Sequence, residues 1–190
     1  LTSLWITITF MKLKILLLTL FLSTSFIGVT YADYKAGVDA FGKGDYKIAF
    51  KEFLPLAEEG NSSAQYIIGR LYRLGQGVLK DYKEAAKWYK KAAEQGARPA
   101  QNALGVMYSK GQGVLRDQKK SVKWFTKAAE QGDANAQVSL GAKFISGEGV
   151  LKDLSKAKYW TQKAYENPDA NASTRDSAEF NWNEFELWKY

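Results

Sequence analysis

The chain repeats one pattern every 36 residues over most of its length. The positions that share this spacing are Ala64, Ala100 and Ala136; Gly69, Gly105 and Gly141; Gly77, Gly113 and Gly149; Asp81, Asp117 and Asp153; and Trp88, Trp124 and Trp160. A unit of this length cannot bury both of its faces alone, so neighbouring units must stack. The repeat therefore predicts an extended array of similar units.

Each unit is predicted to contain two helices joined by a glycine loop. In the first unit, apolar spacing predicts one helix over about 64–74 and another over about 82–95. The loop glycines can take positive φ, and Asp81 can accept the free N–H groups that begin the second helix. No alternation of period two indicates a sheet, so the expected fold class is all-α.

Small residues indicate how the helices pack. Gly69 is expected to let the two helices of a hairpin approach closely, and Ala92 and Ala93 are expected to do the same for the next hairpin. Trp88 is expected to fill the space that remains between them. Stacked in this way, the hairpins form a curved solenoid.

The period, the Gly-x-Gly-Val loop, the following Asp and the Trp of the second helix together resemble the Sel1-like repeat family, a group of tetratricopeptide-like solenoids. The resemblance implies a right-handed α–α superhelix with repeats at 61–96, 97–132 and 133–168. Residues 33–60 resemble a tetratricopeptide repeat more closely and are predicted to form an N-terminal capping hairpin.

The segment 169–190 departs from the pattern and is predicted to be a linker, over 169–175, followed by a C-terminal capping helix. One face of this helix is expected to carry Ala178, Phe180, Phe185 and Trp188. The alternative is an exposed aromatic tail that docks on a partner.

The segment from Met11 to Ala32 has the three parts of a signal peptide: two lysines, an uncharged apolar stretch over 15–29, and small residues before Ala32. Cleavage after Ala32 would make the protein periplasmic or secreted. A retained membrane anchor is the alternative, although the apolar stretch is short for a spanning helix. Residues 1–10 are interpreted as a mis-annotated upstream extension.

The absence of Cys and His from the sequence removes much of catalytic and metal chemistry. It leaves no thiolate nucleophile, no imidazole base and no ordinary zinc, copper or haem site. We therefore predict no catalytic residue, no metal and no cofactor. The net charge of +7 indicates a mildly basic surface. The sequence contains no nucleic-acid-binding motif.

One motif supports an enzymatic alternative. Ser155 and Lys158 match the Ser-x-x-Lys element of serine β-lactamases, but the Ser-Asp-Asn and Lys-Thr-Gly elements are absent. A β-lactam-binding, β-lactamase-like or cell-wall enzyme therefore remains an alternative. A structural oligomer paired through the aromatic C-terminus is another, although a monomer is expected.

The resemblance implies that the first helix of each pair lines a concave face that binds a protein or peptide. The residues expected there are Tyr34, Val38 and Phe41; Tyr66, Arg70, Arg73 and Leu74; Asn102, Val106, Ser109 and Lys110; and Val138, Ala142, Ile145 and Ser146. This face is basic and aromatic in its N-terminal half, which suits a peptide with an acidic segment. The alternative is that these residues simply face solvent or neighbouring helices. The predicted function is that of an exported, non-catalytic scaffold or adaptor.

Overall fold

The computed structural model describes residues 34–190, and every regular element in this range is a helix. A helix over 34–43 is followed by α2 (Tyr46–Glu58), α3 (Ser62–Leu74), α4 (Tyr82–Glu94), α5 (Arg98–Lys110), α6 (Gln118–Glu130), α7 (Ala134–Ser146), α8 (Leu154–Tyr165), α9 (Ala172–Glu184) and the 3-10 helix η1 (Leu187–Lys189). The all-α prediction is confirmed. The signal peptide predicted at 11–32 and the segment 1–10 lie outside the described residues.

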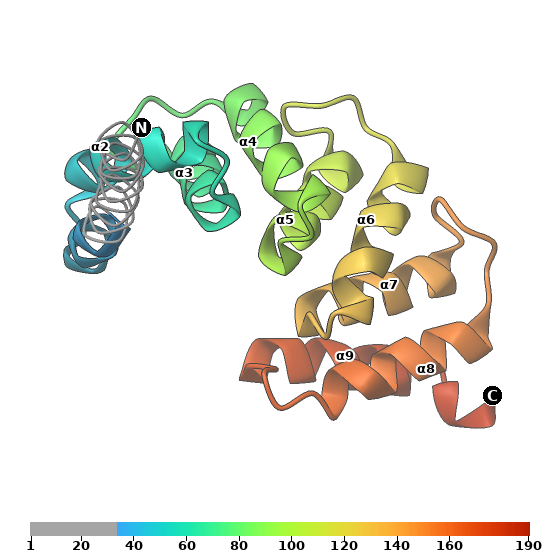
Figure 1. Ribbon diagram of the computed structural model, residues 1–190. Coiled ribbons are helices and arrows are strands. Elements are labelled where there is room, and N and C mark those ends of the chain that lie inside the picture. Colours follow the sequence, from blue (N-terminus) through green and yellow to red (C-terminus); the bar gives the residue numbers. More distant parts are fainter. Residues whose placement is uncertain (1–33) are drawn as a thin grey trace, which may run out of the picture.

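The helices form hairpins that stack one after another along an arc (Figure 1). Each helix packs chiefly against the helices before and after it, and α9 also contacts α7. Helices α3, α5 and α9 lie toward the inside of the arc. The predicted solenoid of stacked helical hairpins is therefore confirmed. Between residues 34 and 190, no helix is both long and apolar enough to cross a membrane.

Aspartates begin the second helix of each repeat, as the sequence predicts. The Asp81 carboxylate accepts hydrogen bonds from the backbone N–H groups of Lys83 and Glu84, at 2.8 and 3.1 Å. At the starts of α6 and α8, Asp117 and Asp153 each accept one such bond, from the backbone N–H groups of Lys120 and Lys156, both at 2.9 Å. These bonds satisfy donors that have no partner within the helix, so they fix where each second helix begins.

The second glycine of each loop is required by contact between hairpins. Gly113 has a φ of 70°, and a Cβ atom there would collide with the carbonyl oxygen of Tyr82, at the start of α4. The loop of one hairpin therefore rests on the first turn of the preceding hairpin's second helix. Gly111 has a left-handed φ of 69° and ends α5.

The glycine within each first helix makes room for an aromatic ring. A Cβ atom on Gly69 would lie 2.7 Å from the Tyr89 ring, and one on Gly105 would lie 2.7 Å from the Phe125 ring. Gly69 thus allows the close approach predicted for it, although its partner is Tyr89. Trp88 packs instead in the core that its hairpin shares with α2.

The C-terminal segment differs from its prediction in two ways. Helix α9 begins at Ala172, so much of the expected linker over 169–175 is helical. The expected apolar face is also wrong, because Ala178 is buried whereas Phe180 and Phe185 are exposed. Leu187 in η1 is the large apolar residue of this segment that is fully buried, against α8. Polar residues occupy most of α9 because it covers the preceding hairpin with only a narrow stripe.

Candidate functional site

Four of the residues predicted in the N-terminal half of the concave face make contacts that centre on two rings, Phe41 and the buried Tyr89. The Arg70 guanidinium lies 4.9 Å from the centroid of the Phe41 ring. The Arg73 Nε donates a 3.3 Å hydrogen bond to the hydroxyl of Tyr89, and the Tyr66 ring lies 5.7 Å from the Tyr89 ring. We call Phe41, Tyr66, Arg70 and Arg73, with Tyr89 beneath them, the basic aromatic surface.

Both arginines of this surface are held in place by rings and not by acids. Within residues 34–190, neither guanidinium forms an ion pair with a carboxylate. Burial raises the pKa of the Tyr89 hydroxyl, so this hydroxyl stays protonated and neutral at physiological pH. The surface therefore keeps two positive charges that can bind a carboxylate of another molecule.

The cap contributes less than the sequence suggested. Tyr34 packs its ring edge-to-face against Phe53, 5.5 Å away, and so belongs mainly to the core of the cap. Val38 is 44% exposed and lies three residues before Phe41 on the same helix. Leu74, at the end of α3, is also exposed.

The second-repeat residues lie half-buried along α5, except the exposed Lys110. Val106 packs against the core, and the Ser109 carbonyl accepts a 3.1 Å hydrogen bond from Gln118 Nε2. The side-chain oxygen of Asn102 is buried and accepts no hydrogen bond within the described residues. These residues form a shallow, mostly neutral continuation of the surface.

The third repeat requires a correction. Ile145 is only 7% exposed and packs in the core with Leu140 and Leu187, so it cannot contact a partner. Val138 is half-buried and lines a cavity of about 240 Å³ between α7 and α9, whereas Ser146 is exposed. Ala142 is half-buried. Of the four residues predicted in this repeat, Ile145 therefore lies inside the protein, and the other three are at least partly exposed.

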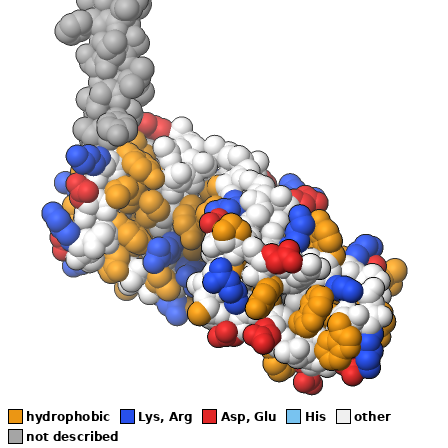
Figure 2. Space-filling model, turned by 90° about the horizontal axis from the view of Figure 1, so that it is seen from below, with side chains coloured by type: hydrophobic (Ala, Val, Ile, Leu, Met, Phe, Trp, Pro, Cys, Tyr) orange, Lys and Arg blue, Asp and Glu red, His pale blue; other side chains and the backbone are white. Residues whose placement is uncertain are grey.

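Charge is distributed unevenly on the face seen in Figure 2. Lys and Arg lie among hydrophobic side chains on both halves of this face, whereas Asp and Glu are more frequent toward the C-terminal half. The basic aromatic surface is built from the helix over 34–43, α3 and α4, so it belongs to the half with fewer acidic side chains, which favours an acidic partner.

The Ser-x-x-Lys motif lies on the outer helix α8. Ser155 is exposed in its first turn, and the Lys158 ammonium lies 5.8 Å from the Trp182 ring centroid. Across residues 34–190, no group of three Asp or Glu side chains comes together as metal ligands.

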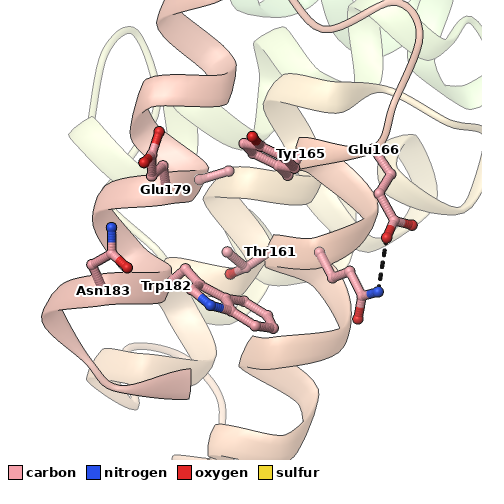
Figure 3. A pocket seen from close by; sticks show the side chains of 8 residues that line it. Thr161, Tyr165, Glu166, Glu179, Trp182 and Asn183 are labelled. Carbon is pink, nitrogen blue, oxygen red and sulfur yellow. Dashed lines mark hydrogen bonds between the residues drawn. The ribbon is translucent and has the colours of Figure 1, made fainter. Parts of the chain in front are cut away.

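Sequence reasoning missed two features of the structure. The first is a buried glutamine in each first helix, Gln65, Gln101 and Gln137, although these residues share the 36-residue spacing that would have revealed them. The second is a pocket of about 340 Å³ between α8 and α9, which Figure 3 shows from close by. No motif marks this pocket, because it arises where the repeat is broken.

Three segments of the chain, 62–96, 98–133 and 134–169, match the family described as Sel1 repeat. A comparison with curated proteins gives no match.

Several solved structures are similar to the chain. A Sel1 repeat protein from Oxalobacter formigenes is 37% identical with a TM-score of 0.68, and the match covers 72% of this chain and 56% of that one. A protective antigen present in uropathogenic Escherichia coli strains, displaying an SLR fold, is 36% identical with a TM-score of 0.75, and the match covers 86% of this chain and 35% of that one. Cysteine-rich protein B of Helicobacter pylori shares the fold at 22% identity and a TM-score of 0.53, over 68% of this chain and 92% of that one. The chain thus spans about half or less of the length of the first two proteins.

Proposed function

The chain belongs to the Sel1 repeat family, whose repeats generally mediate protein–protein interaction, and from this premise we propose that it is a non-catalytic scaffold that binds an acidic peptide segment on its basic aromatic surface. The observation that carries this proposal is the pair of arginines, Arg70 and Arg73, which aromatic residues position and which form no ion pair with a carboxylate of residues 34–190.

The chemistry of these two side chains suits carboxylate recognition. A guanidinium presents a planar set of donors that can bind a carboxylate through two parallel hydrogen bonds. Arg70 lies over a ring and Arg73 uses only its Nε on Tyr89, so the terminal nitrogens of both side chains remain available. Because both side chains are held before binding, less conformational entropy is lost when a partner arrives.

We also propose that the protein is exported, on the basis of the signal-peptide pattern over 11–32. The name of the Escherichia coli protein, a protective antigen, is compatible with a location outside the cytoplasm for that relative. N-terminal sequencing of the protein recovered from its native cells tests this: a chain that begins at Asp33 supports export with cleavage. A chain that retains 11–32 in the soluble cytoplasmic fraction contradicts it.

The binding proposal is tested by fluorescence anisotropy with a labelled acidic peptide, such as a run of glutamates with interspersed leucines. The Arg70→Glu, Arg73→Glu variant is expected to bind at least about tenfold more weakly, since each lost charge pair contributes about 1 kcal/mol or more. The matched control is Lys119→Glu, Lys123→Glu, which makes the same change in net charge on exposed positions of α6. Equal weakening by both variants would mean that only net charge attracts the peptide, and would overturn the proposed site.

A further inference from the structure

The pocket between α8 and α9 has walls from two helices. Thr161, Gln162, Tyr165 and Glu166 come from α8, and Ala178, Glu179, Trp182 and Asn183 come from α9. In Figure 3, Thr161 extends from α8 toward α9, with Tyr165 and Trp182 on either side of it. Helices α8 and α9 lie at the C-terminal end of the arc in Figure 1, away from α3 and α4, which carry most of the basic aromatic surface.

Two truncated side chains create this pocket. Thr161 occupies the repeat position that is Tyr89 in the first repeat and Phe125 in the second, and it packs against Gly141 as those rings pack against their glycines. Ala178 lies seven residues after the N-cap of α9, the place that Leu104 holds in α5 and Leu140 in α7. The space filled between the preceding hairpins is therefore left open here.

The open side of the pocket is not closed by the described chain. Glu179 stands eight residues after the N-cap of α9, where the three earlier first helices carry Gly69, Gly105 and Gly141. A second helix packs on each of those glycines, but a glutamate prevents the same approach. A carboxylate at the rim of the pocket thus takes the position at which the earlier repeats have a glycine that packs against a helix.

Two aromatic side chains, Tyr165 and Trp182, form opposite walls of the pocket. Tyr165 occupies the position of the buried Ala93 and Ala129, and its side chain is 52% exposed. Trp182 is half-buried opposite it. Two rings therefore face a space that solvent can enter.

The charges of the pocket have one sign. Glu166 and Glu179 line it from opposite helices, and no lysine or arginine is among its lining residues. The Glu166 carboxylate accepts a 2.8 Å hydrogen bond from Gln162, and no hydrogen bond or ion pair to Glu179 is made within residues 34–190. This concentration of negative charge stands out in a chain whose net charge is +7.

One side chain of the pocket has a buried hydroxyl that faces α7, since a Cβ atom on Gly141 would lie 2.7 Å from the Thr161 hydroxyl oxygen. Thr161 is 1% exposed, and its hydroxyl oxygen has no hydrogen-bond partner among the described residues. A buried hydroxyl without a partner destabilises a protein by about 1–3 kcal/mol. This unpaired hydroxyl and the two smaller side chains mean that packing around Thr161 is less complete than at the same position of the earlier repeats.

We propose that the α8–α9 pocket binds an organic cation, an alkylammonium group held between the Tyr165 and Trp182 rings and neutralised by Glu179 and Glu166. Aromatic faces attract cations within about 6 Å, and alkylammonium groups are bound in this way by aromatic cages. The Trp182 ring already has one ammonium, that of Lys158, at 5.8 Å, and Lys158 does not line the pocket. The cation could be a free amine or the lysine side chain of a partner.

The test follows the indole N–H signal of Trp182 in two-dimensional NMR spectra of the full chain, assigned through Trp182→Phe. Tetramethylammonium serves as the free cation, an acetylated Gly-Gly-Lys-Gly-Gly amide as the lysine side chain, and tert-butanol as the neutral control. Saturable shifts with a cation and none with tert-butanol are expected. A response to the peptide alone would assign the site to a partner's lysine, and a response to tetramethylammonium would assign it to free amines as well.

Two variants and a control identify the pocket. Glu179→Gln is expected to raise the Kd about threefold to fivefold, the effect of one exposed ion pair. Thr161→Phe restores the ring found at Phe125 and is expected to abolish the shift. Glu184→Gln, on the same helix but outside the pocket, is expected to leave the Kd unchanged. Equal shifts with tert-butanol, or no saturable shift with either cation, would overturn the proposal.

Discussion

The side-chain amide of Gln131 donates a 2.6 Å hydrogen bond to the side-chain oxygen of Gln101, thirty residues earlier in the chain. Gln101 in turn donates from its own amide to the carbonyl oxygen of Ala93, at 3.2 Å. One buried glutamine thus links the end of α4 to the end of α6 across its own helix, α5. The arrangement recurs at Gln65 and Gln137, so it connects each hairpin to the preceding one.

We expect Gln101→Leu to lower the free energy of unfolding by about 1–3 kcal/mol, because it removes two hydrogen bonds of a buried side chain, one to the Ala93 carbonyl and one from the Gln131 amide. Leucine keeps a similar side-chain volume, so lost packing contributes little. Urea denaturation followed by circular dichroism measures the change. Gln162→Leu is the control, since its side chain is exposed and bonds only to Glu166. A loss of the same size in the control would show that replacing any helix glutamine by leucine has this effect, and that the buried hydrogen bonds of Gln101 are not its cause.

Gly105→Ala is expected to destabilise the protein by about 1–3 kcal/mol, because the new Cβ would lie 2.7 Å from the Phe125 ring and force the two helices apart. Gly42→Ala is the matched change within a helix, with no atom within 4 Å of the new Cβ. Alanine should stabilise that position by about 0.5 kcal/mol through backbone entropy. Thermal unfolding of the two variants should therefore move in opposite directions, and a shared direction would contradict the packing role of Gly105.

The repeat made most of the fold predictable. The repeated positions of Gly69 and Asp81 predicted the hairpins and the N-caps of their second helices, because a close helix contact and a helix start each require a particular residue type. The partner of Gly69 was harder to identify, since Trp88 and Tyr89 are adjacent and both apolar. Only the helix phase in the structure shows that Tyr89 faces the glycine.

The candidate site was less predictable, for two physical reasons. Ile145 occupies the same position in its repeat as Arg73, but the C-terminal segment covers it. That cover depends on long-range packing of η1, which the repeat does not predict. The pocket beside Thr161 is defined by side chains that are missing relative to earlier repeats. A comparison of Thr161 with Tyr89 and Phe125 would have found it, whereas a search for motifs could not.

Lys143→Met is expected to stabilise the protein by about 1 kcal/mol. The lysine side chain is nearly buried and bonds to Gln118 and Glu148, at 2.7 and 2.6 Å, in the position that the first two repeats fill with Leu71 and Met107. Removing one partner of an ion pair is costly when the other charge stays buried, but the Glu148 side chain is 47% exposed and can be hydrated, so the main effect is relief of the lysine's desolvation. Urea denaturation at neutral pH checks this, and a clear loss of stability would show that the bonds of Lys143 outweigh its desolvation.

The same variant makes a prediction about pH. The hydrogen bond and charge of Lys143 lower the pKa of Glu148, so this pair stabilises the fold above the ordinary glutamate pKa. That stabilisation is lost as the pH falls through the lowered pKa of the folded state. Lys143→Met removes the main cause of the lowered pKa and leaves only the charge of Arg116, so the stability of the variant relative to the wild type should increase on acidification below about pH 4.5. A difference that stays constant with pH would contradict the assignment of the pKa shift to Lys143.

Tyr89→Phe separates the packing of the ring from its hydroxyl. Phe125 fills the same position in the second repeat, so we expect the ring to fit and the free energy of unfolding to fall by less than about 1 kcal/mol. The hydroxyl that accepts the Arg73 N–H is lost, however, and the guanidinium becomes free to adopt other rotamers. Affinity for the acidic peptide should therefore fall about twofold to fivefold, the size of one hydrogen bond to a charged group that orders the side chain. Fluorescence anisotropy beside Tyr159→Phe, whose ring is exposed on α8, provides the comparison. Unchanged affinity in Tyr89→Phe would show that the partner itself, and not the buried tyrosine, orders Arg73.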